Sequence, residues 1–222
     1  MNFISELTVE LTKLKNAENA NAMEAYMKDN FPFLGIKTKE RRVILQSLWK
    51  KHLPEIKANF RAIGWELITK KEREFHYCGV EILIKELKKK YIKDDAKLIE
   101  KLITTHSWWD SVDFMAKYIL GNYLRQFPEE TLTVIERFSN ANNLWLNRSA
   151  ILFQLDYKAK TNFEILVSEC EKHKESKEFF IQKAIGWALR DYSKFNPLAV
   201  KNYVENTKLM PLSKREALRK LI

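Results

Sequence analysis

Glycine and proline are scarce in this chain: five of each occur among 222 residues. Average usage of the two together is about 12%. A β-sandwich or β-barrel needs many tight turns, which depend on these two residues, so the shortage argues against such folds. It also leaves no G-x-G-x-x-G or Walker A motif that would hold a nucleotide phosphate. The sequence therefore predicts an all-helical protein.

The sequence predicts a soluble cytosolic protein. No apolar run approaches the roughly 18 residues of a membrane span, and residues 1–15 lack the profile of a signal peptide. The two cysteines, Cys78 and Cys170, lie 92 residues apart and form no C-x-x-C motif. We therefore expect reduced thiols and no contact with a membrane.

The basic residues are concentrated towards the two ends of the chain. The formal net charge is +10, with +6 in residues 37–61 and +6 again in residues 181–222, whereas residues 98–147 carry −2. Two basic clusters around a neutral middle favour a polyanionic partner bound at two places. The alternative is a generally lysine-rich composition without a binding role.

Amphipathic helices joined by short connections are predicted along the chain. Ile4, Leu7, Leu11 and Leu14 have helical spacing. Ser107–Asp110 and Ser213–Glu216 match the capping-box pattern, which places each serine just before a helix. Further helix starts are predicted at Thr38, Pro54, Pro128, Asn143, Thr161, Ser176 and Pro197.

In the second half of the chain these helices form pairs. The second helix of each pair is predicted to start near Ser107, Asn143 and Ser176, at intervals of 36 and 33 residues. Such a period suits stacked helix-pair repeats, which curve and give a concave face lined by the second helices. An irregular helix bundle is the alternative.

Familiar catalytic motifs are absent, but one set of residues on the second helices is notable. No nucleophile elbow or metal-ligand spacing occurs around the four histidines, His52, His76, His106 and His173. Trp109 and Asp113 are one helical turn apart, and Arg148 and Trp187 follow Trp109 at successive intervals of 39 residues. Trp109, Arg148 and Trp187 would all reach one concavity. Alternatively, Asp113 forms an ion pair with Arg148 and the tryptophans belong to the core.

Several segments resemble the DNA alkylation repair family, the AlkD-like alkylpurine DNA glycosylases. The matching segments are Phe33–Ile36, Ser107–Asp113, Trp145–Phe153 and Lys177–Trp187, the last continued by Leu189–Tyr192. The resemblance extends through nearly the whole chain. It implies a single domain, residues 1–222, of HEAT-like helical repeats stacked into a curved solenoid with a basic concave face.

The resemblance also implies an activity and its residues. The family hydrolyses the N-glycosidic bond of cationic alkylated purines, 3-methyladenine and 7-methylguanine, in duplex DNA and leaves an abasic site. No metal or other cofactor is expected, and we expect a monomer associated with the nucleoid. Trp109, Asp113 and Trp187 are the predicted catalytic residues. The predicted DNA-binding residues are Arg148, Tyr26, Lys183 and Arg190. Asp156 departs from the pattern, being acidic where a DNA-facing helix favours a basic residue.

The chemistry of a cationic base explains these residue types. Such a base leaves as a neutral molecule and needs no general acid, so positive charge develops on the sugar. The Asp113 carboxylate is suited to stabilise that charge and to orient water, and the Trp109 and Trp187 indoles add cation–π attraction. Arg148 is suited to bind a phosphate. Two alternatives remain at this stage: a non-catalytic protein that binds damaged or branched DNA, and a protein-binding helical scaffold.

Overall fold

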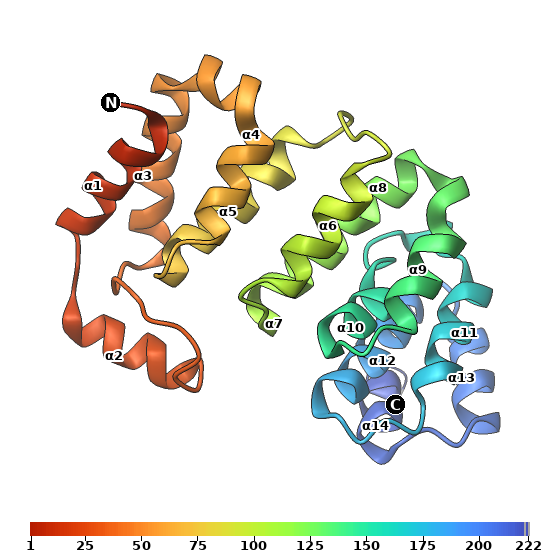
Figure 1. The fold of residues 1–222 in the computed structure, drawn as a ribbon. Helices are drawn as coiled ribbons and strands as arrows, with labels where there is room; N and C mark the ends of the chain where they lie inside the picture. Colours follow the sequence, from red (N-terminus) through yellow and green to blue (C-terminus); the bar gives the residue numbers. More distant parts are fainter. Residues whose placement is uncertain (220, 222) are drawn as a thin grey trace. The chain divides into compact units, whose positions relative to one another are not determined.

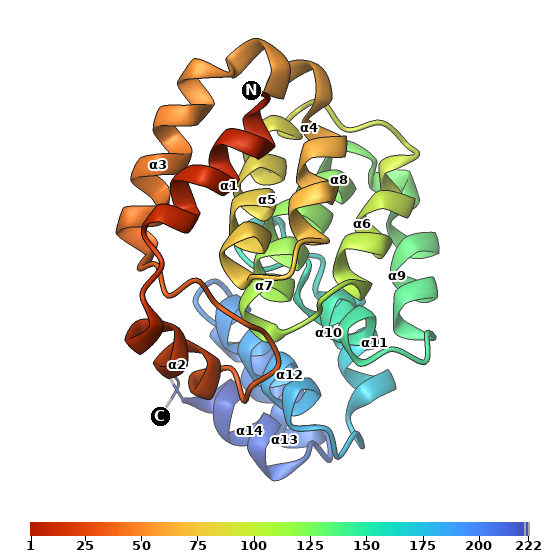
Figure 2. The same ribbon diagram turned by 60° about the vertical axis from the view of Figure 1, so that its left-hand side comes forward.

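The structure, a computed structural model, describes residues 1–219 and 221. These residues form helices and turns and contain no strand, which confirms the predicted all-α class. The chain divides into two compact units, Met1–Lys90 and Tyr91–Ile222. Figures 1 and 2 show the helices of both units in two views. A single domain over residues 1–222 stays a prediction.

The N-terminal unit contains five helices and carries the first predicted apolar stripe in its core. Ile4, Leu7 and Leu11 of that stripe are buried together with Phe3, whereas Leu14 lies beyond the end of the helix and is exposed. The chain turns directly from the third helix into the fourth, where Pro54 occupies the first turn as predicted. The helices are α1 (Phe3–Lys13), α2 (Ala17–Tyr26), α3 (Thr38–Lys51), α4 (Leu53–Ile68) and α5 (Arg73–Glu86).

A buried carboxylate fixes the segment between α2 and α3. Glu74 of α5 accepts hydrogen bonds from the backbone N–H groups of Leu34 (3.0 Å), Gly35 (2.9 Å) and Ile36 (3.1 Å). Gly35 has φ +85°, and a Cβ there would lie 2.0 Å from the Asn16 carbonyl oxygen. A side chain is therefore excluded at this position, which gives a structural reason for the Phe33–Ile36 motif.

The C-terminal unit is a succession of packed helix pairs, visible in the right-hand part of Figure 1. Its first pair joins α6 (Asp95–Thr104) to a continuous helical stretch made of α7 (Trp109–Phe114), a π-helical segment (Met115–Leu120) and α8 (Gly121–Gln126). A short 3₁₀ turn (Pro128–Glu130) follows. The remaining helices are α9 (Thr131–Ser139), α10 (Leu144–Leu152), α11 (Phe163–His173), α12 (Phe179–Tyr192), α13 (Pro197–Asn206) and α14 (Pro211–Leu218), with a 3₁₀ turn at Lys158–Lys160.

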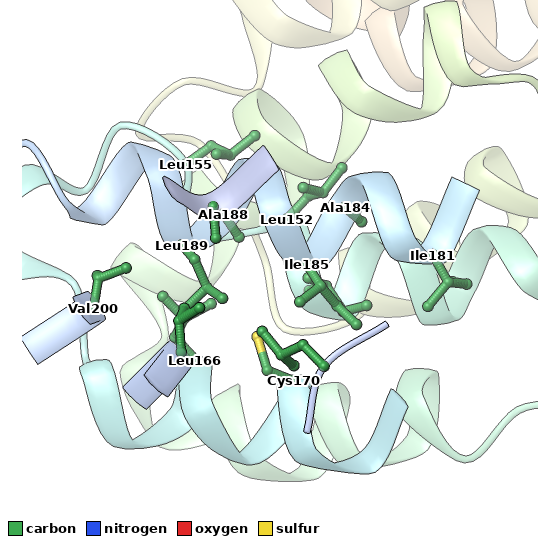
Figure 3. Packing of buried hydrophobic residues seen from close by; sticks show 14 of the residues in the cluster. Leu152, Leu155, Leu166, Cys170, Ile181, Ala184, Ile185, Ala188, Leu189 and Val200 are labelled. Atoms are coloured by element: carbon green, nitrogen blue, oxygen red, sulfur yellow. The ribbon is translucent and has the colours of Figure 1, made fainter. Parts of the chain in front are cut away.

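In this unit α9 packs on α10, α11 on α12 and α13 on α14, while α10 and α14 also pack on α12. The predicted pairing is thus present. Figure 3 shows the core beneath α12, where Ile181, Ile185 and Leu189 meet Leu152 of α10 and Cys170 of α11. Because α12 is central to this core, the side chains on its opposite face have a well-supported backbone.

Two of the predicted helix starts are confirmed in detail. Asn143 caps α10, since its Oδ1 accepts the N–H groups of Trp145 (3.0 Å) and Leu146 (3.1 Å). Pro197 begins α13. The helices predicted from Thr161 and Ser176 begin later, at Phe163 and Phe179.

Both capping boxes are wrong. Helix α7 begins at Trp109, and the Ser107 hydroxyl donates to the Ile103 carbonyl at 2.6 Å. Helix α14 begins at Pro211, so Ser213 lies inside it, and its hydroxyl donates to the Gln182 carbonyl at 3.1 Å. The residues that precede the two helices are instead Trp108 and Met210, and neither helix has a side-chain cap hydrogen bond among the described residues. In the part of the chain that the structure describes, no helix is long and apolar enough to cross a membrane.

Candidate functional site

An ion pair joins α7 to α10. Arg148 donates from Nε to Oδ1 of Asp113 at 2.7 Å and from Nη2 to Oδ2 at 2.8 Å. This is the bidentate geometry that matches a guanidinium to a carboxylate. The sequence left open whether Asp113 pairs with Arg148, and the structure shows that it does.

The pair is largely removed from solvent. The side chains of Arg148 and Asp113 are 5% and 13% exposed. Arg148 also donates from Nη1 to the Phe180 carbonyl of α12. Burial raises the pKa of the Asp113 carboxyl above its ordinary value, and the Arg148 guanidinium opposes that shift. Arg148 of α10 therefore connects its own helix to both α7 and α12.

A pocket of about 340 Å³ brings together most of the predicted residues. It is lined by side chains from α7, α10, α12 and α14. Asp113 is not among the lining residues but binds Arg148, which is. The volume suits part of a nucleotide, and the lining combines aromatic faces with cations. The lining residues are Trp109, Arg148, Phe179, Phe180, Lys183, Trp187, Arg190, Glu216 and Arg219.

The adjacent tryptophans at the start of α7 have different environments. Trp108 packs against Trp145 and Phe180, with ring centroids 5.5 and 5.3 Å away. Its indole nitrogen is buried without a hydrogen-bond partner among the described residues. Trp109 lines the pocket instead. This is the division between a packed and a groove-facing indole that two neighbouring tryptophans require. Trp187 also lines the pocket, although its helical context alone favours a core position.

Lys183 and Arg190 are present in the pocket but are already paired. Both bind Glu216 of α14: Lys183 Nζ lies 2.9 Å from Oε1, and Arg190 Nη1 lies 2.6 Å from Oε2. These contacts lower the pKa of Glu216 to about 2, with Lys183 the larger cause. Four further residues line the pocket but were not predicted from the sequence as site residues: Phe179, Phe180, Glu216 and Arg219.

Two residues singled out in the sequence, Tyr26 and Asp156, are not among the residues that line this pocket. Tyr26 is the last residue of α2 in the N-terminal unit and is 68% exposed. Its role in DNA binding stays a prediction. Asp156 lies beyond the end of α10 and binds Lys117 at 2.6 Å, which lowers its pKa. Its acidic charge is therefore countered within the C-terminal unit by a lysine of the π-helical segment.

His52 and His173 contact neighbouring polar side chains, and both cysteines are buried. Nε2 of His52 contacts Glu6 at 2.6 Å, and Nε2 of His173 lies 2.8 Å from the Ser139 hydroxyl. Cys78 and Cys170 are buried as free thiols. Among residues 1–219 and 221, no group of three or more His, Cys, Asp or Glu side chains is arranged to hold a metal ion.

Comparisons with known proteins agree with this fold. A family model described as DNA alkylation repair enzyme matches residues 7–221. No curated protein matches the chain. Among solved structures, a predicted DNA alkylation repair enzyme from Enterococcus faecalis is 34% identical, with a TM-score of 0.84 over 93% of this chain and 96% of that one.

Two more distant structures share the fold. AlkD2 from Streptococcus mutans is 18% identical, with a TM-score of 0.60 over 90% of this chain and 96% of its own. The smu.31 protein from Streptococcus mutans UA159 is 16% identical, with a TM-score of 0.58 over 81% and 98%. The family match spans nearly the whole sequence and includes every helix that lines the pocket, so this chain belongs to the DNA alkylation repair enzyme family.

Proposed function

We propose that the protein is a monofunctional DNA glycosylase that releases cationic alkylated purines, such as 3-methyladenine and 7-methylguanine, from duplex DNA. The observation that carries this proposal is the pocket itself. Two indoles, Trp109 and Trp187, share it with cationic side chains, and one of these cations, Arg148, is paired with the Asp113 carboxylate. Indoles attract a cationic base, and the cations attract the phosphates beside it.

Departure of the base is the step that needs protein assistance in this proposal. Breaking the N-glycosidic bond sends its electron pair to the purine, which leaves neutral because it was cationic before. The sugar acquires oxocarbenium character, and Asp113 stabilises that charge electrostatically. Arg148 holds the carboxylate in a fixed orientation through two hydrogen bonds. Water then adds to the sugar, and an abasic site remains.

The contacts of Arg148 within the protein modify the role predicted for it from the sequence, which was to bind a phosphate. Its Nε, Nη1 and Nη2 atoms all donate within the protein. It therefore contributes as the partner of Asp113 as well as by its charge towards a nearby phosphate. Lys183, Arg190 and the exposed Arg219 are the more accessible cations of the pocket and complete the proposed DNA contact.

The decisive experiment measures base release from a methylated duplex. The duplex carries a single 7-methylguanine, and the product is the free base together with an alkali-sensitive abasic site. Release by the wild-type protein supports the glycosylase. Salt-dependent binding of the duplex without release would instead favour a non-catalytic DNA-binding protein, and no binding at all would favour a protein scaffold. The proposal further includes a monomeric protein that acts in the cytosol on nucleoid DNA.

A further inference from the structure

Glu216 is the one carboxylate among the described residues that line the pocket. A buried carboxylate costs free energy, and it repels a bound polyanion, unless neighbouring cations pair with it. Here each of its oxygens accepts from a different cation, Lys183 at 2.9 Å and Arg190 at 2.6 Å, and its side chain is 9% exposed. Arg190 Nη1 also donates to the backbone carbonyl of Glu216 at 2.9 Å.

The approach of α14 to α12 places this carboxylate in the pocket. A Cβ on Gly186 would lie 2.4 Å from Cβ of Glu216 and 2.9 Å from the Ser213 carbonyl oxygen, so the two helices touch where α12 has no side chain. The Ser213 hydroxyl donates to the Gln182 carbonyl at 3.1 Å and fixes the relative position of the helices. Both contacts flank Glu216 and restrict where its side chain can reach.

Glu216 spans two turns of α12. Lys183, Trp187 and Arg190 follow one another at intervals of four and three residues, so they lie on the same helix face with Trp187 between the two cations. Two long cationic side chains on one face would repel each other and sample many rotamers. A single carboxylate that binds both holds them on either side of the indole.

The cations keep donors available while Glu216 holds them. Among the described residues, Arg190 makes its hydrogen bonds through Nη1, which leaves Nε and Nη2 as donors. The Lys183 ammonium has three N–H groups and gives one to Glu216. Phosphate contacts can therefore form without breaking the bridge. Glu216 is ionised at neutral pH, because its two cationic partners lower its pKa to about 2.

We propose that Glu216 is a positioning residue: it holds Lys183 and Arg190 on both sides of Trp187, so that their free donors bind phosphates of the strand carrying the base that contacts the indole. This role rests on the proposed glycosylase function. It predicts a division between binding and reaction. Replacing the carboxylate removes the order of the two cations but not their charge, so DNA affinity persists while placement of the lesion is lost.

The test compares Glu216→Gln with the matched control Glu164→Gln. Both substitutions remove one negative charge from the C-terminal unit, but Glu164 is an exposed residue of α11 that lies outside this pocket. Single-turnover release of 7-methylguanine is measured at saturating protein, together with affinity for an undamaged duplex. We expect E216Q to lower release by roughly tenfold or more, as loss of placement does in other enzymes. Its affinity should equal that of E164Q or exceed it, and E164Q should release base at the wild-type rate.

A second background separates positioning from a general structural effect. In a Lys183→Met, Arg190→Met protein Glu216 has no cation to position, so adding E216Q should lower release less than twofold. All rates refer to the folded fraction determined by thermal unfolding. Equal falls in both backgrounds, or a wild-type rate for E216Q, would overturn the role of Glu216. A wild-type protein that releases no base would overturn the glycosylase proposal and this role with it, whereas wild-type release with an unaffected E216Q overturns this role alone.

Discussion

The Asp113–Arg148 pair assigns two roles to the same carboxylate. In the structure Asp113 neutralises a buried guanidinium, and in the proposed reaction it stabilises the developing charge on the sugar. The two roles are compatible, because each carboxylate oxygen retains a second lone pair after accepting one hydrogen bond. They differ in what a substitution would remove.

Asp113→Asn should reduce both stability and base release. Arg148 would remain buried without its counter-charge, which costs about 3 kcal/mol in the free energy of unfolding. An interaction of two charges at ~4 Å and an effective dielectric constant of about 20 contributes roughly 4 kcal/mol, so release per folded molecule should fall about a thousandfold. Urea unfolding and single-turnover release measure the two effects separately. Full activity in the folded fraction would leave Asp113 only as the partner of Arg148.

Individual residues also show how much of the candidate site could be predicted from the sequence. Helical spacing and the family resemblance identified Trp109, Arg148 and Trp187, and all three line the pocket. Glu216 was missed because its partners lie 33 and 26 residues away on another helix. The spacing of Ser213 and Glu216 matches a local capping pattern, and a local pattern carries no information about which distant cation a carboxylate will meet.

At the scale of elements, α12 and α14 are held at close approach by one glycine. Gly186→Ala places a methyl group 2.4 Å from Cβ of Glu216 and 2.9 Å from the Ser213 carbonyl oxygen, so the two helices must shift apart to admit it. We expect a loss of about 1–3 kcal/mol in the free energy of unfolding, typical of overpacking. Asn202→Ala, on the exposed face of α13, is the control and should lie within about 0.5 kcal/mol of wild type. A wild-type midpoint for G186A in urea unfolding would contradict the close approach.

The same helix pair should produce a defined response to acid. A carboxyl group whose pKa is lowered from 4.5 to about 2 stabilises the folded state above pH 4.5, and this contribution is lost as the pH falls towards 2. Glu216→Gln has no such group. The difference in melting temperature between wild type and E216Q should therefore be constant above pH 5 and shrink below it. A difference that grows on acidification would have the wrong sign for this bridge.

Element boundaries were predicted less well than element types. Ile4, Leu7 and Leu11 of the predicted stripe and the proline starts of α4 and α13 were correct, whereas Leu14 lies beyond the end of α1 and is exposed. The capping boxes at Ser107 and Ser213 were wrong, because α7 begins at Trp109 and α14 already at Pro211. The residue at which a helix begins depends on how it packs against its neighbours, which a local capping pattern does not show.

At the scale of the whole molecule, the net charge of +10 predicts electrostatic binding to duplex DNA. Each phosphate neutralised by a lysine or arginine contributes about −0.9 to the slope of log affinity against log salt. We expect a slope of several units with little dependence on base sequence, measured by fluorescence anisotropy on unmethylated duplexes. Affinity that barely changes between low and physiological salt would contradict a polyanionic partner.

Discrimination by the charge of the lesion is the prediction that concerns the complete reaction. Among the described residues that line the pocket, there is no histidine and no acidic side chain other than the doubly paired Glu216, so these residues offer no ready proton donor for a departing base. A neutral lesion such as uracil would leave as an unassisted anion, whereas 7-methylguanine leaves as a neutral base. We expect the protein to release 7-methylguanine and to leave uracil in a matched duplex.

The same reasoning fixes what happens after the base has left. Cleavage of the strand would need a neutral lysine that forms a Schiff base with the sugar. Lys183, the one lysine among the described residues that line the pocket, donates to the Glu216 carboxylate at 2.9 Å, and a nitrogen held in this ion pair is not free to attack the sugar. The strand should therefore remain intact until alkali is added, and EDTA should not alter the rate, since no metal-ligand cluster exists among the described residues. Gel analysis of matched oligonucleotides, with and without EDTA and with borohydride trapping, measures the choice of lesion, the integrity of the strand and the effect of the chelator. Comparable uracil release, a trapped covalent adduct, or inactivation by the chelator would each contradict a hydrolytic glycosylase that acts by charge stabilisation alone.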